Sequence, residues 1–320
     1  MKGIKLIPEE TNFDFVGKRI LAMFFSVALV VGSIGVTVNN GLNFGIDFTG
    51  GTLIELRTPE TPDLQELREL LAGLDLGAIS IQEFGDETDL LVRLPQQEGD
   101  AEVQQAAINK VKETLDSRYE ATEESAGIDY RRVEFVGPQV GEELKKAGGL
   151  AILFSLAGIL AYIWLRFEWQ FGVAAVVALA HDAIATIGLF AFTQMEFNLS
   201  TVAAVLMIAG YSINDTVVVF DRIRENLRKY KKKPLPELFN LSVNQMLTRT
   251  LMTSITTMLA LIALWSFGGE VIRGFVDALI FGILIGTYSS VFVASPVLLF
   301  FNVRAAEEAA EAAAAEAQEA

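Results

Sequence analysis

The chain has 320 residues, of which 52% are hydrophobic and 20% charged, a mixture that excludes an ordinary soluble protein and indicates membrane spans joined to a soluble domain. The formal net charge of −15 argues against nucleic acid as a partner. Because the sequence has no cysteine, disulfides and thiolate metal sites are excluded, and the soluble domain must fold on its hydrophobic core alone.

The N-terminal part predicts a first membrane span over residues 20–38. Residues 1–19 include four basic side chains, and a charge-free run of 19 residues follows them directly. That run ends without the small-residue cleavage site of a signal peptide. We therefore expect an uncleaved span that leaves residues 1–19 in the cytoplasm.

Residues 39–141 have a different pattern and predict an extracytoplasmic domain. Residues 39–140 contain 21 acidic and 8 basic residues, interspersed with apolar alternation. The period changes between that of strands and that of helices in the order β-α-β-β-α-β, which is typical of the ferredoxin-like α+β fold. The predicted strands are 52–57, 79–84, 89–94 and 131–136, and the predicted helices are 63–74 and 102–119.

Five further apolar runs complete a polytopic α-helical membrane protein with six spans. Seven basic residues between 222 and 233 assign the segment 221–246 to the cytoplasm by the positive-inside rule. Small residues recur at every fourth position of the last span, which predicts close helix packing along it. The Ala/Glu-rich segment 304–320 is expected to be a solvated cytoplasmic tail. The five further spans are predicted at 147–165, 170–194, 198–220, 247–268 and 274–301.

Asp215 lies in the middle of the fourth predicted span and is the only charged residue between 197 and 220. A carboxylate in hydrocarbon costs at least ~2.5 kcal/mol, so it is retained for function or offset by a partner. Arg249 opens the next apolar run and is the best candidate for that partner. A structural ion pair and a proton or ion relay are the two alternatives. Helical spacing places Tyr211 and Ser212 on the face of Asp215, and Gln245, Thr253 and Thr256 on the face of Arg249.

A second intramembrane carboxylate, Asp182, follows the only histidine of the chain, His181. Small side chains share its helix face and allow a neighbouring helix to approach closely. A second member of a relay and a buried hydrogen-bonded pair are equally good interpretations. One histidine and one aspartate are too few ligands to indicate a metal site.

Three segments together resemble the SecF group within the SecD/SecF family of bacterial protein-export membrane proteins. They occur in the family's order, and the resemblance extends from about residue 10 to residue 303. The glycines of the first segment do not indicate a phosphate loop, because the Walker lysine is missing and a strand follows. The segments are FGIDFTGGT at 44–52, GYSINDTVVVFDRIREN at 210–226 and LTRTLMTSITT at 247–257.

The resemblance implies one half of a transporter of the resistance-nodulation-division type, with SecD as the other half. It implies a place in the bacterial cytoplasmic membrane, action on unfolded exported polypeptides beside the SecYEG translocon, and YajC and SecA as further candidate partners. It implies no enzyme activity and no cofactor, but coupling to the proton motive force with H⁺ as the ion. The implied relay residues are Asp215, Arg249 and Asp182; the signature residues, whose role is unassigned, are Gly45, Asp47, Gly50 and Gly51.

Two other functions compete with this interpretation. The first is proton-driven export of a lipid or small molecule, which would require a substrate cavity and no translocon. The second is a scaffold that stabilises the translocon, in which the charged pair only holds two helices together.

Overall fold

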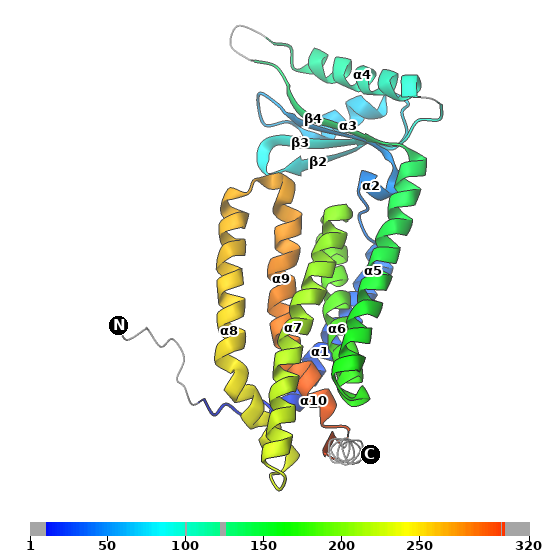
Figure 1. Cartoon of the computed structure of the whole chain (residues 1–320). Helices are drawn as coiled ribbons and strands as arrows, with labels where there is room; N and C mark the ends of the chain where they lie inside the picture. Colours follow the sequence, from blue (N-terminus) through cyan, green and yellow to red (C-terminus); the bar gives the residue numbers. More distant parts are fainter. Residues whose placement is uncertain (1–10, 100, 122–125, 302, 305–320) are drawn as a thin grey trace. The chain divides into compact units, whose positions relative to one another are not determined.

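The structure is a computed structural model that describes residues 11–99, 101–121, 126–301 and 303–304. The chain divides into two compact units. One unit consists of residues 44–150 and 196–199, and the other contains the rest of the described chain. The latter, the helical unit, consists of long helices, and residues 44–150 and 196–199, the second unit, contain a β-sheet (Figure 1).

The helical unit confirms the predicted number of spans. In the described residues, six helices are long and apolar enough to cross a membrane. In the most apolar 18-residue stretch of each helix, α6, α7 and α9 bury between 50% and 61% of the residues, whereas α1, α5 and α8 bury 11% to 17%. The three central helices are therefore where polar side chains can meet away from lipid. The helices are α1 (Arg19–Asn40), α5 (Pro138–Arg166), α6 (Trp169–Thr193), α7 (Leu199–Lys229), α8 (Leu235–Phe267) and α9 (Arg273–Ser289).

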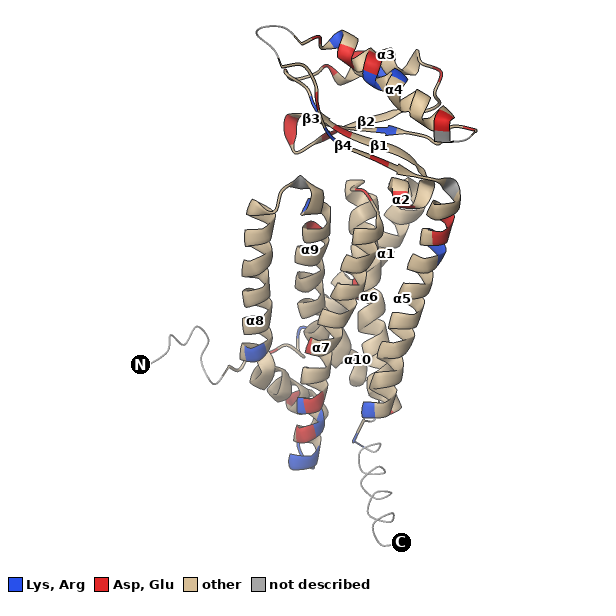
Figure 2. Cartoon of the chain, turned by 45° about the horizontal axis from the view of Figure 1, so that its top comes forward, with Lys and Arg blue, Asp and Glu red and all other residues tan. Residues whose placement is uncertain are grey.

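Several helices extend beyond the predicted spans. α5 begins at Pro138, ahead of the predicted span 147–165, and α7 and α8 occupy most of the predicted basic segment 221–246. Hydropathy marks only the part of a helix that lies in lipid, whereas these polar ends continue the helix into water. In Figure 2 the ribbon at the end of α7 is coloured for a cluster of basic and acidic residues.

The last predicted span, 274–301, is not one regular helix. After α9 the backbone forms a π-helical turn, η2 (Ser290–Ala294), and then a short helix, α10 (Ser295–Leu298). Pro296 explains the change, since it has no N–H to donate and its ring displaces the carbonyl four residues earlier. The Ser295 hydroxyl donates to the Ser290 carbonyl oxygen at 3.1 Å and satisfies one of the acceptors in the widened turn.

Part of the small-residue stripe on α9 does mark a close helix contact. A Cβ at Gly282 would overlap the side chain of Ile208 on α7, and one at Gly286 would lie 3.0 Å from the Cβ of Ser212. At Gly274 a Cβ would meet nothing within 4 Å. The stripe therefore brings α9 against α7 in its middle part.

The second unit has the predicted ferredoxin-like arrangement. Its four strands form one antiparallel sheet in the order β2-β3-β1-β4, and the helices α3 and α4 cover one face (Figure 1). Asp63 caps α3 by accepting from the backbone N–H of Gln65 at 2.8 Å. The elements are α2 (Ile46–Thr49), β1 (Gly51–Arg57), α3 (Leu64–Ala72), β2 (Ser80–Phe84), β3 (Asp86–Leu94), α4 (Ala101–Arg118) and β4 (Asp129–Val136).

The sheet face away from these helices carries a network of charges centred on Asp89. This carboxylate is 4% exposed and accepts hydrogen bonds from Arg57 at 2.7 Å and from Arg131 at 2.9 Å. The Arg57 guanidinium holds the pKa of Asp89 below its usual range, against the opposing effect of burial. The network joins side chains of β1, β3 and β4 by charged hydrogen bonds.

Asp89→Asn is expected to lower the free energy of unfolding of this unit by about 1–2 kcal/mol at neutral pH, because two guanidinium groups lose their anion. Because the pKa of Asp89 is lower in the folded state than its unfolded value of about 3.9, the ionised carboxylate stabilises the fold at any pH above that value. This contribution is lost as the pH falls through the folded-state pKa. The two proteins should therefore converge in acid. Hydrogen exchange of β1 and β3 in the full chain measures the difference. Asp86→Asn is the control, because Asp86 binds the same Arg57 but is 73% exposed; an equal cost would contradict the role of burial.

Candidate functional site

Asp182 lies at the centre of a polar cluster contributed by α6, α7 and α9. The residue is 0% exposed. Its Oδ2 accepts hydrogen bonds from the hydroxyl of Ser212 and, at 2.7 Å, from that of Ser289. Its Oδ1 lies 2.9 Å from His181 Nδ1. Three helices therefore converge on one carboxylate, and the two serines are partners that the sequence analysis did not identify.

His181 connects this cluster to α1. Its Nε2 is buried and has no hydrogen-bond partner among the described residues, and its ring centroid lies 6.1 Å from that of Tyr288. The Tyr288 hydroxyl donates to the Ala22 carbonyl oxygen at 2.7 Å and lies 3.0 Å from the Ser26 hydroxyl. The imidazole thus has one nitrogen in contact with Asp182 and one that is buried without a hydrogen-bond partner among the described residues.

Asp215 lies one helical turn after Ser212 on the same face of α7, as the spacing predicted. It is 4% exposed, and its Oδ2 has no hydrogen-bond partner among the described residues. Thr250 and Arg249, both on α8, interact electrostatically with this carboxylate. The Arg249 side chain itself is exposed, and the structure does not place it in an ion pair with Asp215. Asp215 is therefore a buried carboxylate within the electrostatic range of a cation.

The predicted polar stripe on α8 divides into two groups. Gln245 faces α7, since its Oε1 accepts from Arg222 at 2.8 Å and from Asn226 at 2.9 Å. Thr253 and Thr256 instead donate to carbonyl oxygens of their own helix. Ser254, which the prediction did not include, links α8 to both neighbours. The hydroxyl of Tyr211 on α7 donates to it at 3.3 Å, and its own hydroxyl lies 2.7 Å from that of Thr287 on α9.

The glycine-rich segment 44–52 has a structural role in the second unit. The Gly45 N–H donates to the Phe197 carbonyl oxygen at 2.9 Å, and Asp47 accepts from the N–H of Leu199 at 2.9 Å. Gly50 and Gly51 have φ values of 70° and 113°, and a Cβ at Gly51 would lie 2.5 Å from the Leu94 carbonyl oxygen. The segment thus holds the chain that enters α7, and it contains a four-residue helical turn, α2, that the sequence did not predict.

Comparisons with known proteins agree with one another. Residues 117–304 match the family model "Protein export membrane protein SecD/SecF, C-terminal", and residues 35–58 match the "SecD/SecF GG Motif". The chain is 47% identical over 298 residues to a protein translocase subunit SecF from Rickettsia bellii, covering 93% of this chain and 96% of the relative. It is also 47% identical to the SecF subunit of Cereibacter sphaeroides, covering 94% of this chain and 93% of that one.

Two solved structures share the fold. The crystal structure of SecDF from Thermus thermophilus, a translocon-associated membrane protein, superposes with a TM-score of 0.81 at 36% identity and covers 92% of this chain. SecDF in a super-membrane-facing form gives a TM-score of 0.68 at 37% identity and covers 97%. This chain spans 39% and 41% of those two longer chains.

Proposed function

This chain belongs to the SecF family of protein translocase subunits, and we propose that it joins SecD to couple the proton motive force to late steps of protein export through SecYEG. Membership of the family places the chain in protein export as a multi-pass membrane protein. The partnership with SecD is supported by the solved SecDF chains, of which this chain matches about two fifths. YajC and SecA are further candidate partners.

The orientation that we propose follows from charge. The basic residues at the end of α7 and in the connection to α8 favour the cytoplasm, which places both termini inside and the ferredoxin-like unit outside. The membrane that we propose is the bacterial cytoplasmic (inner) membrane, across which the proton gradient is maintained. Protons would then enter from the side of the ferredoxin-like unit.

The observation that carries the proposal is the buried Asp215, whose Oδ2 has no hydrogen-bond partner among the described residues and whose carboxylate interacts electrostatically with Arg249. A guanidinium nearby favours the ionised carboxylate, and separation of the two in an apolar site favours the neutral acid. A helix shift and a proton transfer are therefore coupled at this residue. Each elementary charge that crosses the membrane contributes ~2.3 kcal/mol per 100 mV, which is enough to shift a conformational equilibrium.

Asp182 is proposed as the second relay residue. The Ser212 hydroxyl bonds Asp182 and sits one turn from Asp215, so a rotation of α7 that moves Asp215 also alters the hydrogen bonds of Asp182. His181 Nε2 offers a further proton acceptor beside it. Arg249 would act by its charge and not as a carrier of the proton.

The test is export of a preprotein into inverted vesicles that contain SecYEG and SecD, with and without this chain, in the presence or absence of an imposed proton gradient. We expect the gradient to accelerate late export only when the chain is present. Equal acceleration without it would refute the proposal. Proton-coupled release of lipid or a small molecule from vesicles lacking SecYEG would favour an independent exporter. If the chain accelerates preprotein export equally with and without the gradient, a scaffold would be favoured.

A further inference from the structure

The strand β4 lies at one edge of the sheet and is exposed along most of its length. Among the described residues it pairs only with β1, in the strand order β2-β3-β1-β4. Five of its eight residues are exposed, whereas six of the seven residues of β1 are buried. An edge strand leaves every second backbone N–H and C=O group without a partner in the sheet. β4 therefore offers one open side to a further strand.

One hydrogen bond sets the direction of the backbone groups on β1. Thr58, directly after β1, donates its N–H to the Thr88 carbonyl oxygen of β3 at 2.9 Å. Backbone groups alternate in direction along a strand, so the even-numbered residues of β1 face β3. The odd-numbered Leu53 and Glu55 therefore face β4.

The outward backbone groups of β4 follow from this alternation. The partners of Leu53 and Glu55 on β4 are Glu134 and Arg132, and the register between them is regular. These two residues of β4 thus turn their backbone groups toward β1. Val133 and Phe135 alternate with them and turn their N–H and C=O groups outward.

The side chains of the same two residues form an exposed apolar pair. Val133 is 40% exposed and Phe135 is 47% exposed. They lie opposite Ile54 and Thr52 of β1, on the sheet face that α3 and α4 cover. A segment added beside β4 would place every second side chain next to this pair. Apolar side chains at alternate positions of that segment are therefore favoured.

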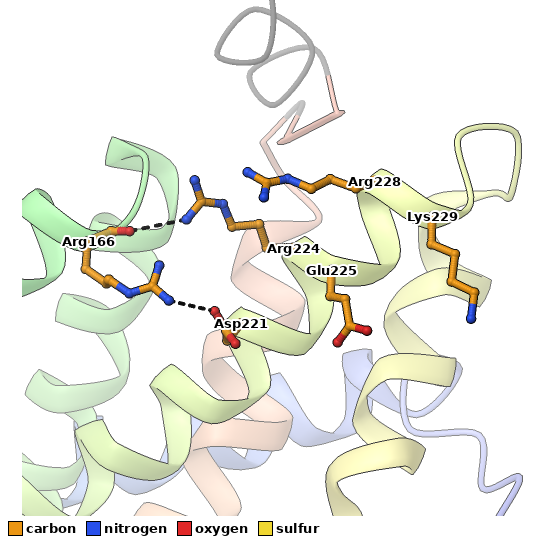
Figure 3. Close-up of a pocket in the computed structure, with 6 residues that line it drawn as sticks. All are labelled: Arg166, Asp221, Arg224, Glu225, Arg228 and Lys229. Carbon is orange, nitrogen blue, oxygen red and sulfur yellow. Dashed lines mark hydrogen bonds and ion pairs between the residues drawn. The ribbon is translucent and has the colours of Figure 1, made fainter. Parts of the chain in front are cut away.

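Two other open backbone acceptors of the chain are covered by arginine side chains. On the opposite edge of the sheet, Arg68 donates to the Ile81 carbonyl oxygen of β2 at 3.3 Å. In the helical unit, Arg224 donates to the Arg166 carbonyl oxygen at the end of α5 at 3.3 Å (Figure 3). In the described part of the chain, no side chain makes such a bond to the backbone of β4. The open side of β4 is thus the accessible edge of the sheet.

We propose that β4 binds an extended segment of the exported polypeptide as a further antiparallel strand. Each strand of this sheet is antiparallel to its neighbours. Pairing through the main chain accepts many sequences, which suits a translocase subunit that meets many unfolded chains. This inference rests on the proposed function for the identity of the polypeptide, but it involves no residue of the proposed relay.

The test is binding of a fluorescent peptide to the full-length chain in mixed micelles, measured by fluorescence anisotropy. The peptide alternates valine and threonine and has lysines at both ends. Two further peptides carry N-methyl groups, one on its valines and the other on its threonines. In an antiparallel pair, a valine opposite Val133 or Phe135 turns its own N–H toward β4. Methylation of the valines should therefore weaken binding at least ~10-fold, and methylation of the threonines less than about threefold.

Two variants make the complementary change in the chain. Val133→Pro removes an outward N–H of β4 and leaves the bonds to β1 in place, whereas Val133→Ala shortens the side chain and keeps the N–H. Binding of the unmethylated peptide should weaken about 5- to 10-fold in the proline variant and less than about threefold in the alanine variant. Unchanged hydrogen exchange of β1 and β3 would show that the sheet is intact in both.

Equal binding of the two methylated peptides, or equal losses in the two variants, would overturn the proposal. Hydrogen exchange of the Val133 and Phe135 amides tests the other occupants. Protection by purified SecD without peptide would assign the edge to a strand of that subunit, and protection that grows with the concentration of the chain alone would assign it to a second copy; either result would also overturn the proposal. The assay contains neither SecYEG nor a gradient, so its failure leaves the proposed proton coupling standing, and failure of the vesicle assay leaves this site standing.

Discussion

Asp215→Asn is expected to remove at least ~10-fold of the gradient-stimulated rate of late export, and to leave export without a gradient unchanged. Asparagine has nearly the shape of aspartate and occupies the same buried position, but it does not take up or release a proton. The measurement is the vesicle assay with SecYEG and SecD, in which the rate with an imposed proton gradient is divided by the rate without it. Equal amounts of assembled complex are compared.

Asp221→Asn is the matched control for this substitution. It makes the same chemical change on the same helix, but Asp221 is 59% exposed and lies at the polar end of α7. The control should keep the full response to the gradient. If Asp215→Asn also responds like the wild type, Asp215 is a structural residue, and proton coupling must be sought at Asp182 or in SecD.

Asp182→Ala is expected to lower the free energy of unfolding by about 2–4 kcal/mol, the largest effect on stability among these substitutions. The change leaves the Ser212 and Ser289 hydroxyls and His181 Nδ1 without their acceptor inside an apolar bundle. Unpaired buried donors cost more than the hydrogen bonds themselves contributed. Equilibrium unfolding of the full chain in mixed micelles measures the loss.

Two further variants test the explanation. Asp277→Ala removes a carboxylate from α9 that accepts a bond from Trp265 at 2.9 Å at an exposed site, and it should cost less than about 1 kcal/mol. In the Asp182→Ala background, Ser289→Ala should cost less than it does in the wild type, because the serine no longer has an acceptor to lose. A cost for Asp182→Ala no larger than that for Asp277→Ala would show that the cluster does not hold the helices together.

The sequence predicts the number of spans and the topology of the sheet because both depend on periodicity along the chain. Apolar runs of about 20 residues have one stable solution in a membrane. The change of period in the soluble unit gives βαββαβ, and strand pairing then follows from burying one face. The place of Asp215 in the middle of α7 was likewise predictable, since it is a matter of counting residues along a helix.

Contacts between helices were less predictable, because they depend on how each helix is rotated against its neighbour. Arg249 was assigned as the partner of Asp215 from equal depth, yet its side chain is exposed and the two form no ion pair in the structure. Ser289 lies in a serine pair within an apolar helix, and nothing in its spacing distinguishes it from Ser290. Only the packing of α9 against α7 at Gly286 shows why the hydroxyl of Ser289 reaches Asp182.

The hydrogen bond from the Leu199 N–H to Asp47 fixes the first residue of α7, the helix that also carries Asp215. Leu199 is the first residue of a helix that runs without interruption through Asp215 to Lys229. Sixteen residues separate the clamped end from the carboxylate, a distance of about 24 Å along the axis. The proposed rotation of α7 at Asp215 would therefore also act on the residues that hold the beginning of the helix. The glycine-rich signature, which contains no proposed relay residue, is thus joined by one continuous helix to the buried carboxylate.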